Sequence, residues 1–220
     1  MSFRNPEKRT VSVLKIFVFL ACLLPLTRLL LETFGVAGFS LGANPVEELL
    51  HRCGIWGLNF LLITLAVTPV RRLLKLNWLL RFRRMFGLFA FFYICLHFTV
   101  YAALDQRFNL AAIAEDIAER PYITLGMTGL TLLIPLAITS TNGMMRRLGR
   151  RWTRLHRLVY VVALLGVWHF WWQVKKDITE PLIYVAILAV LLGFRLVVAW
   201  QGKKNRRHSV PSQTETASAG

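Results

Sequence analysis

Six apolar runs dominate this sequence and limit what the chain can fold into. They cover roughly residues 11–31, 55–71, 85–104, 122–140, 156–174 and 181–200. Each has about 17–21 residues, the length that an α-helix needs to cross the hydrocarbon core of a bilayer. Because a backbone in lipid must pair its own polar groups, such runs form helices. We therefore expect an all-α fold, a bundle of six transmembrane helices.

The composition supports membrane insertion and argues against a nucleic-acid partner. Hydrophobic residues make up 55% of the 220 residues, yet the net charge is +16. A nucleic-acid-binding protein with that charge would be far less apolar. The two values agree if the apolar residues lie in the membrane and the basic residues lie in loops. Cys22, Cys53 and Cys95 form no CxxC pair, so we expect them to be packing residues.

The charges in the loops predict the orientation of the bundle. Basic residues collect before the first run, between the second and third, between the fourth and fifth, and after the sixth. By the positive-inside rule these segments face the cytoplasm, so both termini are expected there. Residues 1–10 would then be a cytoplasmic N-terminus, 11–201 the transmembrane domain, and 202–220 a disordered cytoplasmic tail.

Two loop segments on the opposite side have helical patterns. NPVEELLHRCG (44–54) has a proline near its start and acidic residues in its first turn, which is typical of a helix N-terminus. LAAIAEDIAER (110–120) is expected to be a short amphipathic helix on the outer membrane surface. The sequence shows no P-loop and no internal repeat, and it leaves no room for a soluble cofactor-binding domain.

Two histidines lie at nearly equal depth in the predicted membrane. His97 lies about 18 Å from the cytoplasmic end of the third run, at 1.5 Å per residue. His169 lies about 20 Å from the same end of the fifth run, which crosses in the same direction. Two neutral imidazoles at one level can bind a haem iron from both faces, an arrangement suited to electron transfer. The alternative is that each histidine only makes polar contacts with a neighbouring helix.

His156 shares the apolar run of His169 but lies at its cytoplasmic end. On an ideal helix the two side chains would point about 140° apart. One interpretation is a second haem near the cytoplasmic face, although Arg83 and Arg84, which are not ordinary haem ligands, occupy the matching depth of the third run. The other interpretation is an interfacial histidine in a basic loop.

Three further residues have an open role. Arg195, in the sixth run, either extends to the cytoplasmic face or binds a haem propionate or another anionic cofactor. Phe170 belongs to an aromatic belt at the outer interface, and as the neighbour of His169 it could also contact a macrocycle. His51 is either a plain interfacial residue or a contact for a quinone or a partner protein.

Four segments carry a family resemblance: NPVEELLHRCGIWGLNFLLITLAVTPVRRLL, RRMFGLFAFFYICLHFTVY, RPYITLGMTGLTLLIPLAITST and LGRRWTRLHRLVYVVALLGVWHFWW. Together they resemble the MsrQ (YedZ) family, the haem-binding membrane subunits of the bacterial methionine sulfoxide reductase system, which belong with the ferric-reductase-like transmembrane domains. The resemblance runs from about Asn44 to Trp172. It implies b-type haem in the bacterial inner membrane, with His97, His156 and His169 at the ligand positions.

The resemblance also implies partners. The catalytic subunit would be a periplasmic, molybdopterin-containing protein (MsrP), on which oxidised methionine is reduced, so this chain would be an electron-transfer subunit in the repair of periplasmic proteins. Electrons would come from the quinone pool or from a cytoplasmic flavin reductase. FMN is associated with the family, although this sequence has no flavin-binding motif. The alternatives are a stand-alone ferric or quinone reductase and, in another class, a haem-free membrane scaffold.

Overall fold

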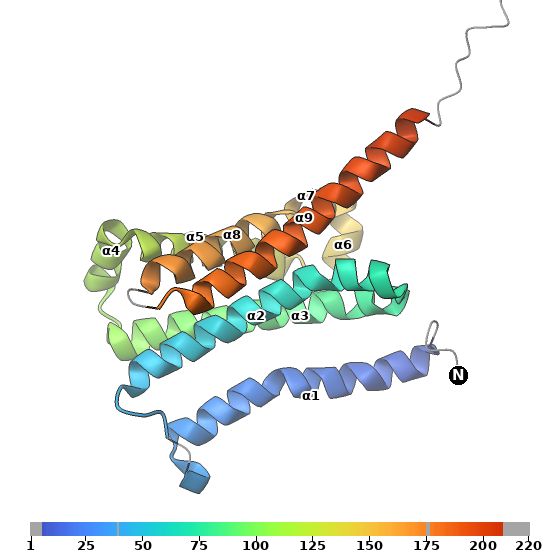
Figure 1. The fold of residues 1–220 in the computed structure, drawn as a ribbon. Coiled ribbons are helices and arrows are strands. Elements are labelled where there is room, and N and C mark those ends of the chain that lie inside the picture. The colour runs from blue at the N-terminus through green and yellow to red at the C-terminus, as the bar shows by residue number, and fades with distance from the viewer. Residues whose placement is uncertain (1–5, 39, 175–176, 209–220) are drawn as a thin grey trace, which may run out of the picture.

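The computed structural model describes residues 6–38, 40–174 and 177–208, and within these ranges every regular element is helical (Figure 1). The long helices are α1 (Lys8–Thr33), α2 (Pro45–Leu74), α3 (Leu80–Val100), α5 (Pro121–Ile138), α8 (Leu158–Gln173) and α9 (Thr179–His208). The short helices are α4 (Leu110–Glu119), α6 (Asn142–Leu148) and α7 (Arg150–Leu155); a π-helical turn at Tyr101–Asp105 extends α3, and single 3₁₀ turns lie at Val36–Gly38 and Asn77–Leu79. The predicted all-α fold is confirmed for these ranges.

Five helices are long and apolar enough to cross a membrane. They are α1, α2, α3 with its π-helical turn, α5, and residues 179–201 of α9. The remaining apolar run forms α8, which has 16 residues and is therefore about 24 Å long. α8 packs along α5, and the start of α1 and the end of α9 lie at the same end of the bundle (Figure 1). The sixth crossing stays a prediction.

The expected helix starts on the other side of the bundle are present. The side chain of Asn44 accepts a hydrogen bond from the backbone N–H of Glu47, and Pro45 is the first residue of α2. Asn109 caps α4 in the same way, through the N–H of Ala112 (3.2 Å). These caps form because the first N–H groups of a helix have no partner inside the helix.

Two boundaries differ from the sequence-based expectation. The run containing His156 and His169 is not one helix, because α7 ends at Leu155 and α8 begins at Leu158. At the break the N–H of Val159 bonds to the carbonyl of His156, an i to i+3 bond that tightens the chain locally. At the other boundary, α9 continues to His208, into the segment expected to be a disordered tail; residues 209–220 lie outside the described ranges.

α1 contacts the bundle at a point where its own backbone hydrogen bonding is interrupted. Pro25 has no N–H, and proline inside a helix opens the ladder around it. The buried hydroxyl of Tyr93 enters this opening from α3. It donates to the carbonyl of Cys22 (2.9 Å) and accepts from the N–H of Leu26 (3.0 Å). One side chain of α3 thus completes the backbone hydrogen bonding of α1.

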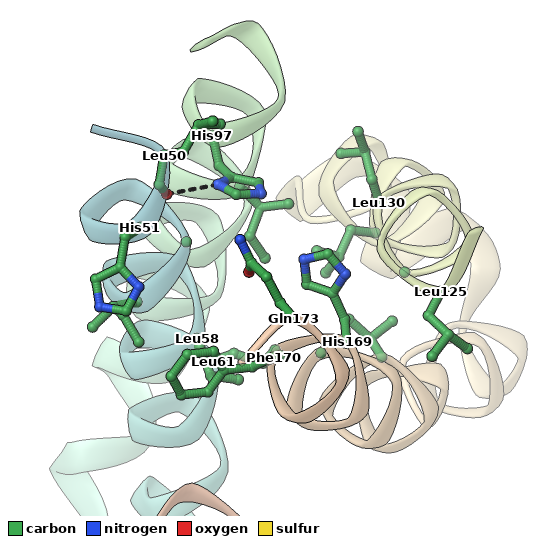
Figure 2. Close-up of a pocket in the computed structure, with 17 residues that line it drawn as sticks. Leu50, His51, Leu58, Leu61, His97, Leu125, Leu130, His169, Phe170 and Gln173 are labelled. Carbon is green, nitrogen blue, oxygen red and sulfur yellow. Dashed lines mark hydrogen bonds between the residues drawn. The ribbon is translucent and has the colours of Figure 1, made fainter. Parts of the chain in front are cut away.

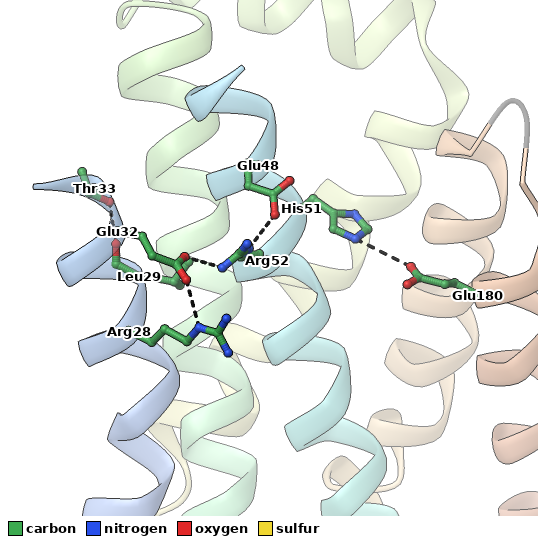
Figure 3. Close-up of polar contacts among 8 residues, drawn as sticks. All are labelled: Arg28, Leu29, Glu32, Thr33, Glu48, His51, Arg52 and Glu180. Atoms are coloured by element: carbon green, nitrogen blue, oxygen red, sulfur yellow. Dashed lines mark hydrogen bonds and ion pairs between the residues drawn. The ribbon is translucent and has the colours of Figure 1, made fainter. Parts of the chain in front are cut away.

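A buried ion-pair network makes the second attachment of α1 (Figure 3). The Glu32 side chain is only 4% exposed, and its carboxylate binds both Arg28 of the same helix, at 2.9 Å, and Arg52 of α2. Arg52 also binds Glu48 (2.5 Å). Arg28 and Glu32 are an i,i+4 pair within α1, whereas Arg52 links Glu32 to α2. A buried carboxylate with two guanidinium partners is the arrangement that low-dielectric surroundings require.

Candidate cofactor site

The structure brings the side chains of His97 and His169 close together, as their equal depth predicted. His97 lies near the end of α3 and His169 near the end of α8, and their ring centroids are 6.1 Å apart with planes at 81°. Figure 2 shows the two rings on opposite sides of one cavity, with the side chain of Gln173 reaching between them. The equal rise of two helices that run in the same direction places them at one level.

Each imidazole is held by a backbone carbonyl of the helix beside it. Nδ1 of His97 lies 2.9 Å from the carbonyl oxygen of Leu50, and Nδ1 of His169 lies 2.6 Å from that of Tyr122. Because a carbonyl only accepts, both Nδ1 atoms carry the proton and both Nε2 atoms have a free lone pair. Neither Nε2 has a hydrogen-bond partner within the described part of the chain. The two free nitrogens are therefore available as metal ligands.

A glycine gives each ring access to its carbonyl. Gly54 is four residues after Leu50, and a Cβ added there would lie 3.2 Å from Nδ1 of His97. Gly126 is four residues after Tyr122, and its added Cβ would lie 3.1 Å from both Nδ1 and Cε1 of His169. Side chains four apart lie above one another on a helix, so a larger residue would cover the carbonyl. Only glycine leaves both ring and hydrogen bond undisturbed.

The two half-sites repeat each other, which corrects the expectation that the chain has no internal repeat. Each carbonyl and its histidine are 47 residues apart in the sequence. Each carbonyl is followed by the pattern GxxG (residues 54–57 and 126–129), and each histidine is followed by phenylalanine. The helix pair α2 and α3 thus matches the pair α5 and α8. The signal was missed because it rests on few positions spread over two helices.

The space between the rings, which we call the histidine cavity, is narrow and apolar. It measures about 80 Å³ and is lined mainly by leucine, isoleucine, valine and glycine. Phe170 lies in its wall, as expected for a neighbour of His169, and His51 lies at its edge. Nε2 of His51 is 3.7 Å from the carboxylate of Glu180, which ties α2 to α9 (Figure 3).

The donor set fits a haem better than a bare metal ion. The described residues contain no group of three or more His, Cys, Asp or Glu side chains able to hold an ion, whereas a porphyrin brings four nitrogens and needs only axial ligands. Two metal–nitrogen bonds of about 2 Å and half of each ring add to roughly 6 Å, which agrees with the 6.1 Å separation. A macrocycle exceeds the 80 Å³ of free space, so side chains such as Gln173 must turn aside to admit it.

A second, larger cavity lies at the other end of α8. This basic cavity measures about 560 Å³, and His156, Arg83 and Arg84 all line it, as their matched depth predicted. Other cations around it are Lys15, Arg81 and Arg157, while no carboxylate lines it among the residues that the structure describes. Such a cavity favours a ligand with negative charge.

His156 is positioned by the break between α7 and α8. Its ring stacks on the indole of Trp152 with centroids 3.9 Å apart, and its Nε2 lies 3.2 Å from the hydroxyl of Thr139. The indole N–H of Trp152 donates to the carbonyl of Thr139 (3.0 Å). Among the residues that the structure describes, His156 is the one histidine that lines the basic cavity. His156 is thus held at the cavity wall by α5 and α7 rather than by a paired imidazole.

Arg195 lines neither cavity and instead completes the backbone bonding of α2. Its Nη2 donates to the carbonyl of Leu65 (2.6 Å) and its Nη1 to the hydroxyl of Tyr160. Four residues after Leu65 comes Pro69, which has no N–H, so α2 leaves this carbonyl without its own donor. Arg195 supplies that donor, a role that neither sequence-based interpretation included. Tyr160 lines the basic cavity, which gives Arg195 only an indirect link to it.

Comparison with known proteins agrees with this geometry. Residues 53–167 match the family described as "Ferric reductase like transmembrane component". Proteins named "Protein-methionine-sulfoxide reductase heme-binding subunit MsrQ" are similar over most of their length. That of Herminiimonas arsenicoxydans is 48% identical over 96% of both chains, and that of Rhodospirillum rubrum is 53% identical over 88% of this chain and 92% of its own. That of Xanthomonas campestris pv. campestris strain 8004 is 55% identical over 78% and 79%.

The chain belongs to the MsrQ family. The family match and the five long apolar helices together make it a multi-pass membrane protein. The matched region begins within α2 and ends within α8; it includes His97 and the break that holds His156, and it stops two residues before His169.

The pairing of Arg195 with a proline-freed carbonyl predicts a coupling between two positions. In Arg195→Met the carbonyl of Leu65 loses its donor, but in the Pro69→Ala background the new N–H at residue 69 can replace it. We expect Arg195→Met to lower the free energy of unfolding by about 1 kcal/mol less in the Pro69→Ala background than in the wild-type background. That value is the usual cost of leaving a buried polar group without a partner. Thermal unfolding of the four proteins in detergent measures the coupling.

The matched control replaces Pro25, the proline of α1, which Arg195 does not contact. Combining Pro25→Ala with Arg195→Met should give additive changes in stability. If the stability changes are non-additive to the same extent with both prolines, or additive with Pro69, then Arg195 does not act through the carbonyl of Leu65.

Proposed function

We propose that this chain is a haem b electron-transfer subunit that delivers electrons across a membrane to a methionine sulfoxide reductase. The observation that supports this most directly is the pair of imidazoles with protonated Nδ1 and free Nε2 atoms on opposite sides of one cavity. Its relatives carry "heme-binding subunit" in their names, which agrees with this donor set. A haem bound there would supply reversible one-electron chemistry at its iron.

The residues of the chain have separate tasks in this proposal. His97 and His169 would hold the haem through their free Nε2 atoms, and a haem held by two histidines would supply electron transfer rather than catalysis at its iron. The carbonyls of Leu50 and Tyr122 fix the orientation of the imidazoles and increase their basicity. The apolar wall, including Phe170, keeps water away from the cavity. Such surroundings set the reduction potential together with the ligands.

The proposed topology is six crossings, with both termini in the cytoplasm of a bacterium and the protein in its inner membrane. The support is that the basic segments lie at one end of the bundle, where positive charge is normally retained in the cytoplasm. The histidine cavity would then lie toward the periplasm and the basic cavity toward the cytoplasm. α8, although short, would be the fifth crossing, since shorter spans can be matched by local thinning of the bilayer.

The proposed partner is the catalytic subunit of the reductase, a periplasmic protein of the molybdopterin-containing MsrP type. The names of the relatives describe a subunit, which implies a second component. Reduction of methionine sulfoxide would take place on that partner, because the histidine cavity offers no open metal position to a substrate. Electrons would enter from the quinone pool or from a cytoplasmic flavin reductase, and the system would repair oxidised periplasmic proteins.

We also propose that the basic cavity binds a second cofactor through His156. A second haem there would take one axial ligand from His156 after Thr139 releases its Nε2, and the surrounding arginines would bind its propionates. The volume of about 560 Å³ and the excess of cations support an anionic cofactor of this size. FMN, which the family resemblance suggested, is the competing occupant because the same cations could bind its phosphate.

The main proposal predicts that His97 and His169 act as one unit. His97→Ala and His169→Ala should each abolish the low-spin haem spectrum and partner-dependent reduction of methionine sulfoxide, because one iron needs both ligands. The double substitution should cost little more than either single one. The measurement is the reduced-minus-oxidised absorption spectrum with the haem-to-protein ratio, with His208→Ala in α9 as a control histidine.

A single variant that keeps a full low-spin spectrum would show that the two histidines do not share one iron. Loss of sulfoxide reduction with full electron transfer to ferric salts or quinones would leave the haem assignment intact. Retained reduction of such acceptors in cells lacking any sulfoxide reductase would favour a stand-alone ferric or quinone reductase instead.

The glycines beside the rings predict a spectroscopic change without loss of stability. Gly54→Ala and Gly126→Ala push a methyl group against an imidazole, so the angle between the ring planes, now 81°, must change. Alanine is favoured over glycine in a helix by about 1 kcal/mol, which offsets a similar cost for a disturbed imidazole hydrogen bond, so thermal stability should change little. Electron paramagnetic resonance of the oxidised iron and its midpoint potential should both shift.

The control for the glycines is Gly193→Ala in α9, where an added Cβ meets nothing within 4 Å. That variant should keep the wild-type resonance and potential. If Gly54→Ala and Gly126→Ala give the same electron paramagnetic resonance spectrum as Gly193→Ala, the two glycines do not set the orientation of the imidazoles.

A separate test concerns His156. His156→Ala should lower the haem-to-protein ratio while leaving the spectrum that depends on His97 and His169 unchanged. Haem is measured as the pyridine haemochrome, and flavin is measured by fluorescence after acid release. A fall in flavin instead of haem would assign the basic cavity to FMN, and no change in either would remove His156 from cofactor binding.

A further inference from the structure

A cleft between α1 and α3 combines an apolar floor with a cationic rim. It measures about 410 Å³ and is lined by Phe19, Met85, Leu88, Phe89 and Phe92, together with the cations Lys15, Arg81 and Arg84. We call it the α1–α3 cleft. The lining residues come from both helices: Lys15 and Phe19 from α1, and the other six from α3. A ligand that fits must therefore have both an apolar and an anionic part.

The cleft exists because α1 is attached to the bundle elsewhere. Tyr93 binds α1 at Cys22 and Leu26, and Glu32 binds Arg52 beyond that point. Toward the basic end the rings of Phe19 and Phe89 still touch, with centroids 5.2 Å apart. Lys15 lies about one turn beyond Phe19.

The cations of the cleft lack carboxylate partners within the described ranges. Lys15 lies in a helix that is otherwise apolar around it, and neither Lys15 nor Arg81 has a hydrogen bond or ion pair to another described residue. Arg84 binds only the neutral side-chain oxygen of Asn142. A lysine or arginine at the edge of hydrocarbon is costly unless an anion or water satisfies it. Three cationic side chains without carboxylate partners at one cleft therefore favour the binding of an anion.

We propose that the α1–α3 cleft binds an anionic phospholipid of the leaflet at the basic end of the bundle. The phosphate lies between Lys15, Arg81 and Arg84, and one acyl chain follows the phenylalanine and leucine side chains of the floor. Basic pockets between membrane helices are known to select anionic headgroups. A neutral quinone or a zwitterionic lipid would use the apolar floor but leave the cations without a partner. This assignment does not depend on haem binding.

The test compares lipid retention by the whole chain after removal of lipid in detergent. Native mass spectrometry measures binding of dioleoyl phosphatidylglycerol and dioleoyl phosphatidylcholine to wild type, to Lys15→Gln/Arg81→Gln, and to Arg146→Gln/Arg147→Gln. The last variant removes the same charge from α6 at the same end, outside both the cleft and the basic cavity. We expect tighter binding of phosphatidylglycerol, weakened roughly fivefold for each cation lost from the cleft and little changed in the control.

Several outcomes would overturn the proposal. The first is equal binding of phosphatidylglycerol and phosphatidylcholine. The second is an equal loss of phosphatidylglycerol binding in the two double variants. The third is displacement of the lipid by free glycerol 3-phosphate, which lacks acyl chains. Lys15, Arg81 and Arg84 also line the basic cavity. A double variant that loses haem or flavin but keeps phosphatidylglycerol would assign these cations to the cofactor instead. Retained lipid selectivity in His156→Ala would in turn separate the cleft from the cofactor.

Discussion

The geometry of the candidate site depends on hydrogen bonds between two imidazoles and two helix carbonyls. The carbonyls of Leu50 and Tyr122 fix which nitrogen of His97 and His169 carries the proton and which nitrogen faces the cavity. A helix surface normally hides its carbonyls under side chains, so the arrangement requires a glycine one turn later. Because both half-sites meet the same requirement with the same spacing, the two helix pairs place their histidines symmetrically about one cavity.

The same physical rule explains how the outer helices are attached. In hydrocarbon no water is present to form a hydrogen bond with an unpaired backbone group. A proline in a membrane helix therefore leaves backbone groups that a polar side chain of a neighbouring helix can bind. Tyr93 occupies the opening at Pro25, and Arg195 donates to the carbonyl that Pro69 leaves free. Proline therefore determines contacts between helices here, and a buried arginine that resembles a cofactor ligand is accounted for by packing.

The sequence was sufficient for features that follow from helix geometry and insufficient for those that depend on neighbours. A fixed rise per residue predicted that His97 would meet His169 and that His156 would share a level with Arg83 and Arg84. It did not predict the break at His156, which depends on local i to i+3 bonding, nor the narrow space between the rings. The carbonyl partners and the role of Arg195 required knowledge of which helix lies beside which.

Charge is distributed differently at the two ends of the bundle, and this difference limits what each end can bind. At the end with α4, three arginines have carboxylate partners: Arg28 and Arg52 bind Glu32, Arg52 also binds Glu48, and Arg120 binds Asp116 at 3.0 Å. At the other end the cavity and the cleft are lined by arginine and lysine without carboxylates in the described residues. The histidine cavity, near the end with α4, is lined mainly by apolar residues. At the other end, the absence of carboxylates among the described lining residues favours a ligand with negative charge, and this is the common physical basis of the proposals for a cofactor in the basic cavity and a lipid in the α1–α3 cleft.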